Sequence, residues 1–125
     1  MKILLDTNAL IWIITNDLRY IKVKDIILSE SNEIYISPIS FLEIAIKLRI
    51  GKIVIDLQKA ISISKTTGFK ELHLSSYHAL MLLSFPMYHK DPFDHIILDQ
   101  AKYENMTIIT GDKIFKKYLP GPIVI

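Results

Sequence analysis

The sequence predicts a single α/β domain, in which helices flank both faces of a mostly parallel central sheet. Short apolar or β-branched runs alternate with helical runs along the chain, an order typical of layered folds with parallel strands. Half of the 125 residues are hydrophobic, enough for one sizeable core, but the chain is too short for two domains. We therefore expect one domain over residues 1–125, with ligands bound at the carboxyl ends of its strands.

The first half of the chain is expected to contain two strands. The run Lys2–Leu5 is almost entirely apolar, as strands buried on both faces are. Ser37 and Pro38 favour the start of a helix, and Gly51 favours its end. In order, we expect a strand at Lys2–Leu5, a helix at Ala9–Thr15, a helix over residues 22–31, a strand at Glu33–Ile36 and a helix from Ser37 to about Ile50.

The second half continues the alternation after Gly51. Gly68 favours the end of one helix, and Ser84–Phe93 holds two prolines and is expected to be a loop. We expect a helix at Asp56–Thr67, a short strand or extended link at Lys70–Leu74, helices at Ser75–Leu83 and His95–Glu104, a strand at Met106–Thr110, a short helix at Lys113–Tyr118 and a closing strand at Ile123–Ile125.

The composition indicates the cellular environment of the protein more clearly than its activity. A net charge of +2 permits contact with a polyanion without indicating one. The absence of cysteine excludes disulfides and thiolate metal sites and fits a reducing cytosol. Asp6 interrupts the apolar start too early for a secretion signal, and no apolar stretch is long enough to cross a bilayer. We expect a soluble cytoplasmic protein without membrane contact.

Four acidic residues lie where strands end or helices begin, namely Asp6, Glu43, Asp94 and Asp112. If the fold gathers them at one sheet edge, each pair 4 Å apart repels by roughly 4 kcal/mol at an effective dielectric near 20. A divalent cation that prefers oxygen ligands would offset this repulsion. Such an ion, held by carboxylates and water, is suited to cutting phosphodiester bonds.

Each acid could also serve an ordinary structural role. Asp91 can cap a helix with Pro92 in its first turn, and Asp94 then lies at the positive helix end. Equally local roles are open to the remaining acids, namely a helix cap by Asp112, an Asx-turn by Asp6 and an i, i+4 ion pair between Glu43 and Lys47.

Capping does not explain why Glu43 lies in a helix that is apolar on most sides. A glutamate there loses hydration unless it faces a cation or a polar cleft. Small polar residues also accompany the acids, as the supporting groups of a metal site do. These residues are Thr7, Asn8, Ser37, Ser40 and Thr110.

Four short motifs span nearly the full length of the chain. They are Leu4-Leu5-Asp6-Thr7-Asn8, Ser37-Pro38-Ile39-Ser40-Phe41-Leu42-Glu43-Ile44, Asp91-Pro92-Phe93-Asp94 and Thr110-Gly111-Asp112. With these motifs in this order, the chain resembles the PIN-domain (PilT N-terminus) nucleases, specifically the toxin ribonucleases of VapBC-type toxin-antitoxin pairs.

The resemblance implies an endoribonuclease of a type II toxin-antitoxin system, with a three-layer PIN-like fold. Asp6, Glu43, Asp94 and Asp112 would bind one or two Mg²⁺ or Mn²⁺ ions, and Asp6 and Asp94 would be the most direct ligands. A metal-bound water would attack the phosphorus, so no side-chain nucleophile is needed. Thr7, Asn8, Ser40, Asp91 and Thr110 would support these ligands.

Two positions depart from the family pattern. Asp99 lies where relatives have a small apolar residue, and we expect it to be a solvated acid. His95 replaces a common arginine. It could touch phosphate when protonated, but we expect a surface residue. His73, His78 and His89 show no spacing typical of metal ligands.

Partners follow from charge, composition and the resemblance. Candidate contacts to the RNA backbone are Lys47, Arg49, Lys52, Lys113, Lys116 and Lys117, although lysines also simply solvate helices. The high apolar fraction predicts a buried interface. The resemblance implies a homodimer and a DNA-binding VapB-type antitoxin, assembled as a heterotetramer or larger. The antitoxin's C-terminal segment would cross the acidic cleft, where an arginine can replace the metal charge.

Three further functions remain open on the sequence. The same fold could form a catalytically silent RNA-binding or interaction module, which would bind RNA without cleaving it. A haloacid-dehalogenase-type phosphatase also begins with a strand-terminal aspartate but needs a second one two residues later, where this chain has Asn8. A receiver-type phosphoacceptor domain is also possible, but this chain lacks the acidic pair before the strand and the late lysine at a strand end that such a domain is expected to have.

Overall fold

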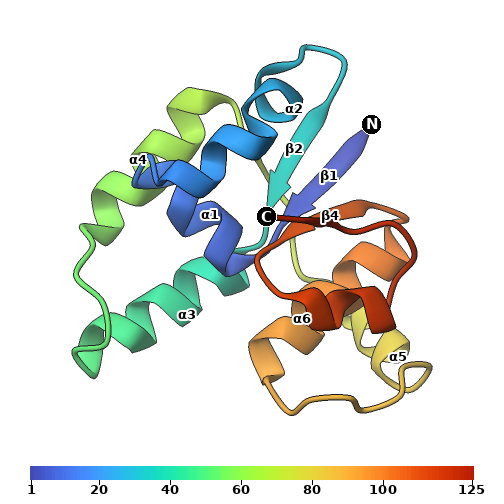
Figure 1. Cartoon of the computed structure of the whole chain (residues 1–125). Helices are drawn as coiled ribbons and strands as arrows, with labels where there is room; N and C mark the ends of the chain where they lie inside the picture. Colours follow the sequence, from blue (N-terminus) through green and yellow to red (C-terminus); the bar gives the residue numbers. More distant parts are fainter.

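The computed structural model describes all residues from 1 to 125 and contains strands and helices in the predicted alternation (Figure 1). In chain order the elements are β1 (Lys2–Leu5), α1 (Thr7–Ile14), the 3₁₀ helix η1 (Leu18–Val23), α2 (Lys24–Leu28), β2 (Glu33–Ile36), α3 (Pro38–Arg49), α4 (Leu57–Thr67), β3 (Lys70–Glu71), η2 (Ser76–His78), α5 (Ala79–Leu82), α6 (Pro92–Tyr103), β4 (Thr107–Thr110), η3 (Lys113–Lys117) and β5 (Ile123–Val124).

The five strands form one sheet in the order β3-β2-β1-β4-β5, and every neighbouring pair is parallel. The chain moves from β1 to β2 on one side and places β4 on the other side of β1. The strand order therefore reverses between β1 and β4, whose residues Leu5 and Ile109 are paired in register. In open parallel sheets, the crevice at such a reversal, beyond the carboxyl strand ends, is the usual ligand site.

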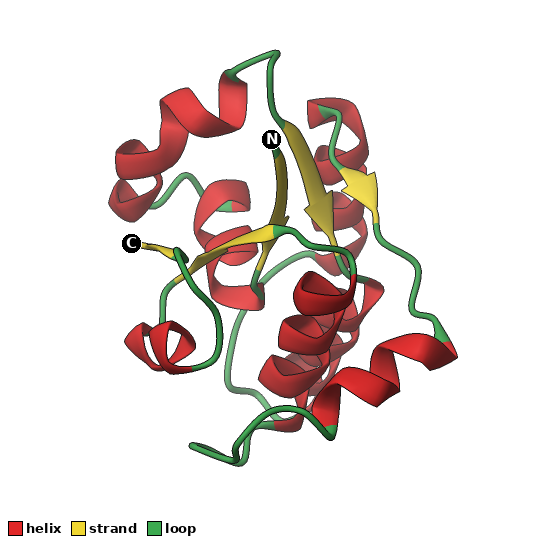
Figure 2. Ribbon diagram, turned by 90° about the vertical axis from the view of Figure 1, so that its right-hand side faces the viewer, coloured by secondary structure: helices red, strands yellow, loops and turns green.

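Both faces of the sheet are buried, which explains why the strands are apolar without alternation. Ile3 and Leu5 belong to a core cluster shared with α1, η1 and α2, whereas Leu4 belongs to a second cluster shared with α6 and η3. Successive residues of a strand point to opposite faces, so β1 contributes to both cores. Figures 1 and 2 show the resulting layers, with α1, α2 and α4 on one side of the sheet and α5 and α6 on the other.

The main departure from the predicted elements lies before β2. Residues 22–31 were expected to form one helix, but the chain forms η1 first and α2 ends at Leu28. The side chain of Asp17 caps η1 by accepting the N–H of Arg19, and Ser29 adopts extended backbone angles that end α2. Local capping and turn chemistry therefore replaced a continuous helix.

Several predicted boundaries shift by a few residues. The helix predicted from Ala9 starts at Thr7 because Asp6 caps it, and the helix predicted from His95 starts at Pro92 because Asp91 caps it. The Ser75 helix begins as η2 before α5, and the strand at Lys70 covers only two residues. No helix is both long and apolar enough to cross a membrane.

Candidate active site

Asp6 lies directly after β1 and is almost completely buried at the sheet reversal. Its Oδ1 accepts the N–H of Ala9 at 2.8 Å, which caps α1. Its Oδ2 accepts the hydroxyl of Thr110, the last residue of β4, at 2.6 Å and the N–H of Gly111, the next residue, at 3.3 Å. The carboxylate therefore joins the ends of two neighbouring strands.

Burial raises the pKa of Asp6 to about 6, although its hydrogen bonds to Thr110, Ala9 and Gly111 act in the opposite direction. The negative charge of Glu43 is a smaller contribution to this increase. Asp6 and Glu43 are 37 positions apart in sequence but close enough for their charges to interact. The site thus holds negative charge that water does not fully screen.

Glu43 comes from α3, near the carboxyl ends of the strands, and is also buried. Its Oε2 forms the expected i, i+4 ion pair with Lys47 Nζ at 2.8 Å. Its Oε1 is buried without a hydrogen-bond partner. An unpartnered carboxylate oxygen in a buried position is costly, and an oxygen-binding cation would satisfy it.

Asp94 lies in the first turn of α6, the helix that Asp91 caps through the N–H groups of Phe93 and Asp94. Burial, together with the charges of Asp91 and Asp6, raises the pKa of Asp94 to about 6. His89 opposes this shift, because its Nε2 lies 3.1 Å from Asp94 Oδ2. Asp94 and Asp6 therefore belong to the same electrostatic unit.

The histidine beside Asp94 was missed by the sequence reasoning. His89 lies in the loop before α6, and its Nδ1 lies 2.8 Å from the Tyr118 hydroxyl at the end of η3. Tyr118 is buried and also accepts the N–H groups of Tyr88 and His89. A five-residue spacing between His89 and Asp94 was the only sequence signal for this contact, and nothing in the sequence pointed to Tyr118.

Asp112 differs from the other three acids in its exposure to solvent. It is exposed, and its Oδ1 caps η3 by accepting the N–H of Ile114 at 2.9 Å. Its own N–H donates to Thr110 Oγ1 at 2.9 Å, so its backbone is tied to the residue that bonds Asp6. The structure places Asp112 at the same edge, but as a helix cap.

The predicted supporting residues divide into two groups. Thr110 bonds Asp6, and Thr7 donates a buried hydrogen bond to Ser40 at 3.1 Å, joining the start of α1 to α3. Asn8 is exposed and forms no side-chain hydrogen bond, whereas Ser37 caps α3.

No three acidic or histidine side chains are grouped tightly enough to form a ready metal-binding cluster. Each acid instead uses a partner from the chain, namely Thr110 for Asp6, Lys47 for Glu43 and His89 for Asp94. Like charges that lie close together repel one another unless a cation lies between them. The oxygen donors still match the preference of Mg²⁺ or Mn²⁺.

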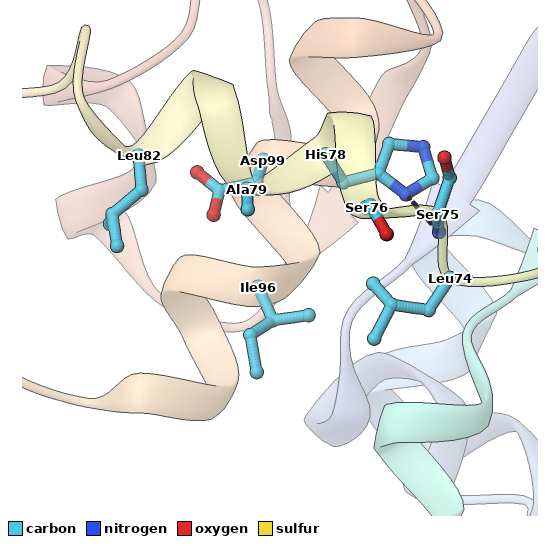
Figure 3. Close-up of a pocket in the computed structure, with 8 residues that line it drawn as sticks. All are labelled: Leu74, Ser75, Ser76, His78, Ala79, Leu82, Ile96 and Asp99. Atoms are coloured by element: carbon cyan, nitrogen blue, oxygen red, sulfur yellow. Dashed lines mark hydrogen bonds between the residues drawn. The ribbon is translucent and has the colours of Figure 1, made fainter.

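The expectation that Asp99 is solvated is wrong. Asp99 is only 4% exposed, and its Oδ1 has no partner. Figure 3 shows its carboxylate beside Ala79, between α5 and α6, at a pocket of about 380 Å³. Burial raises its pKa to about 6. The reason is tertiary: α5 packs over the face of α6 that holds Asp99.

The expectation that His95 is a surface residue is also wrong. His95 is buried, and its Nε2 donates to the carbonyl of His89 at 2.6 Å. The ring packs edge-on against Tyr118 with centroids 5.4 Å apart. His95 therefore supports the loop that holds His89. His78 is structural too, since it caps η2 and contacts Glu104.

The candidate RNA contacts are not equivalent. Lys47 is engaged with Glu43 and only partly exposed. The others are exposed, and Lys117 lies over the Tyr88 ring. These exposed residues are Arg49, Lys52, Lys113, Lys116 and Lys117.

Comparison with solved structures finds the same fold in toxin-antitoxin complexes. A chain of VapBC2 from Rickettsia felis, solved with a promoter DNA fragment, is 21% identical with a TM-score of 0.74, covering 100% of this chain and 98% of that one. A chain of DNA-bound VapBC from Salmonella typhimurium is 19% identical, with a TM-score of 0.69 and coverages of 100% and 97%. At this identity the likeness shows the fold alone.

A third structure is VapC20 from Mycobacterium tuberculosis, described as a toxin that cleaves the sarcin-ricin loop. It is 14% identical with a TM-score of 0.61, covering 95% of this chain and 98% of that one. No curated protein matches the sequence. The PIN domain family model matches residues 3–118, nearly the whole chain. The chain therefore belongs to the PIN domain family.

Proposed function

We propose that this protein is a metal-dependent endoribonuclease and the toxin of a type II toxin-antitoxin pair. The observation behind the proposal is the electrostatic unit of Asp6, Glu43 and Asp94. These acids come from three distant segments and lie buried or half-buried at the sheet reversal, where the charge of Glu43 raises the pKa of Asp6 and the charge of Asp6 raises the pKa of Asp94. Perturbed carboxylates gathered in this way are typical of functional sites.

Asp6, Glu43 and Asp94 would hold Mg²⁺ or Mn²⁺, with Asp112 binding directly or through water. These ions prefer carboxylate and water oxygens, and the buried, unpartnered Oε1 of Glu43 is such a donor. When bound, a divalent ion supplies an acidified water and neutralises charge that develops on the phosphate.

The chain's own residues hold the carboxylates in place. Thr110 and Gly111 orient Oδ2 of Asp6, and His89 orients Oδ2 of Asp94. Burial keeps bulk water from screening these charges. Lys47 would have to release Glu43, or share it, when an ion binds. No serine, threonine or histidine needs to attack the phosphorus.

The proposed partners are RNA, a second copy and an antitoxin. The exposed basic residues on α3 and η3 would bind phosphate, and VapC20 is described as a toxin that cleaves the sarcin-ricin loop. An exposed apolar row at Leu42 and Ile46 on α3 and at its C-cap, Ile50, favours burial by another chain. The solved complexes of the VapBC type favour a VapB-type antitoxin as one partner.

An RNA-cleavage assay tests the proposal. We expect the wild-type protein to cut RNA only when Mn²⁺ or Mg²⁺ is added, and Asp6→Asn and Asp94→Asn to remain folded but lose cleavage. Asp25→Asn changes an exposed acid at the start of α2 and is the matched control that should retain activity.

Two outcomes would contradict the proposal. Equal cleavage by all four proteins would indicate a contaminating ribonuclease. RNA binding by the wild type without any product, in either metal, would identify the alternative of a catalytically silent PIN module.

A further inference from the structure

The Tyr118 hydroxyl has three partners, and together they determine where its proton points. It lies 2.8 Å from the N–H of Tyr88, 3.0 Å from the N–H of His89 and 2.8 Å from His89 Nδ1. A phenol has one proton to donate and lone pairs to accept with. Because the two N–H groups can only donate, they occupy the lone pairs, and the proton is left for His89 Nδ1.

This arrangement selects one tautomer of His89. A neutral imidazole that accepts at Nδ1 has its proton on Nε2. His89 Nε2 lies 3.1 Å from Asp94 Oδ2 and therefore donates to it. The hydrogen bonds run in one direction, from Tyr118 to His89 and from His89 to Asp94. Oδ1 of Asp94 makes no hydrogen bond within the chain.

The His89 ring is also held from its flanks. Its backbone carbonyl accepts from His95 Nε2 at 2.6 Å, and its backbone N–H donates to Tyr118. The ring packs against those of His95 and Tyr118, with centroids 4.9 Å and 5.3 Å away. Both the position and the donor direction of His89 are thus set by η3 and α6.

We propose that His89 is a positioning residue for Asp94, and that Tyr118 imposes the tautomer in which His89 donates. One oxygen of Asp94 is then held by the protein, and the other stays free for a cation. Carboxylate ligands of metal ions are commonly oriented by such an outer donor, whose loss lowers metal affinity by about 10–100-fold. The consequence for metal binding rests on the proposed function, but the tautomer does not.

The tautomer can be measured without metal or substrate. A long-range ¹H–¹⁵N correlation spectrum of the histidine rings should show His89 with its proton on Nε2, and the His89→Gln spectrum assigns that signal. Tyr118→Phe should weaken the preference and shift the tautomer ratio toward a proton on Nδ1, because only Asp94 Oδ2 then favours the proton on Nε2. Tyr88→Phe removes a neighbouring phenol hydroxyl that forms no hydrogen bond, and should leave the preference intact. A proton on Nδ1 in the wild type, or an unchanged tautomer ratio in Tyr118→Phe, would overturn the inference.

The positioning role is tested by Mn²⁺ titration, with free Mn²⁺ measured by electron paramagnetic resonance. His89→Leu removes the donor and should weaken binding about 10–100-fold. His89→Gln restores an N–H donor and should recover most of the affinity. Melting curves check that each variant is folded, because a merely structural role would lower the melting temperature without changing affinity.

The outcomes separate this inference from the proposed function. Equal Mn²⁺ affinity in wild type and His89→Leu, or equal weakening in His89→Leu and His89→Gln, would overturn the positioning role alone. If the wild type binds no Mn²⁺, the proposed function fails, and with it the positioning role. The ring spectra would still decide the Tyr118 part of the inference.

Discussion

Thr110 donates a 2.6 Å hydrogen bond to Oδ2 of Asp6, across 104 positions of sequence. The same hydroxyl accepts the N–H of Asp112. One side chain at the end of β4 therefore orients the acid after β1 and the turn that leads to the last acid. This contact connects the two strands on either side of the sheet reversal, at the edge where the candidate site lies.

Replacing Thr110 by valine should show how much the hydrogen bond from Thr110 to Asp6 contributes to stability. Thr110→Val keeps the shape but leaves Asp6 with a weaker set of donors, so we expect a loss of about 1.5–3 kcal/mol at pH 7.5, typical of a hydrogen bond to a charged group. The pKa of Asp6 should rise further, because this bond lowers it. Urea unfolding and carboxyl NMR titration measure the two effects.

Thr110→Ser is the control, because it keeps the hydroxyl and loses only a buried methyl group, about 0.8 kcal/mol. If valine destabilises the protein no more than serine does, the hydrogen bond contributes no more than the buried methyl group.

Removing the Lys47 ammonium should make stability depend more strongly on a divalent ion. Lys47→Met leaves Glu43 buried without its partner. Since the lysine end is partly exposed, we expect a loss of about 1–3 kcal/mol, below the 3–5 kcal/mol typical of fully buried pairs. Thermal melts with and without Mn²⁺ should show a larger metal-induced gain in Lys47→Met than in the wild type.

The double variant Glu43→Gln with Lys47→Met removes both charges. It should be more stable than Lys47→Met without metal and should lose the extra gain from Mn²⁺. An identical metal response in all three proteins would separate Glu43 from the proposed ion site.

Asp99 should make the protein less stable as pH rises. Its pKa is raised from 3.8 to about 6 in the folded state by burial, so the folded state binds its proton more tightly than the unfolded state does. The stability this provides is complete below pH 3.8 and is lost as pH rises to about 6.

The free energy of unfolding of Asp99→Asn should therefore exceed that of the wild type by about 1–3 kcal/mol at pH 8 and approach it near pH 4. Urea unfolding across this range measures the difference. Asp25→Asn, at an exposed site, should show no such trend. A wild type that matches Asp99→Asn at pH 8 would mean that solvent reaches the carboxylate.

Gly111 should not tolerate a side chain. A Cβ at this position would overlap the outer ring of the Trp12 indole, on which the Arg19 guanidinium also packs, 4.0 Å from the ring centroid. Gly111→Ala should therefore cost about 1–3 kcal/mol, as overpacking does, and should disturb the N–H that bonds Asp6.

Adding Trp12→Leu should recover much of the stability lost in Gly111→Ala, with Trp12→Leu alone as the reference. Unfolding curves measure the coupling between the two positions. Purely additive losses would place the cause in the backbone of Gly111 and not in its contact with Trp12.

Local sequence signals accounted for much of the architecture. The order of strands and helices, the caps at Ser37 and Asp91 and the ion pair of Glu43 with Lys47 were all predicted. These features depend on residues within about four positions of one another, where propensity and capping act. The prediction of one helix over residues 22–31 was less accurate, because competing capping and turn interactions divide this segment into η1 and α2.

The sequence by itself determined the fold class, the family and the acids that end the strands, because hydrophobic period, caps and short motifs are local properties. Only the tertiary structure decided that Asp99 and His95 are buried, since both face α5, η3 or the Tyr88–His89 loop and not solvent. It also decided that Tyr118 contacts His89, a pairing across 29 positions. Contacts between distant segments depend on how the layers pack, so the residues nearby in sequence do not predict them.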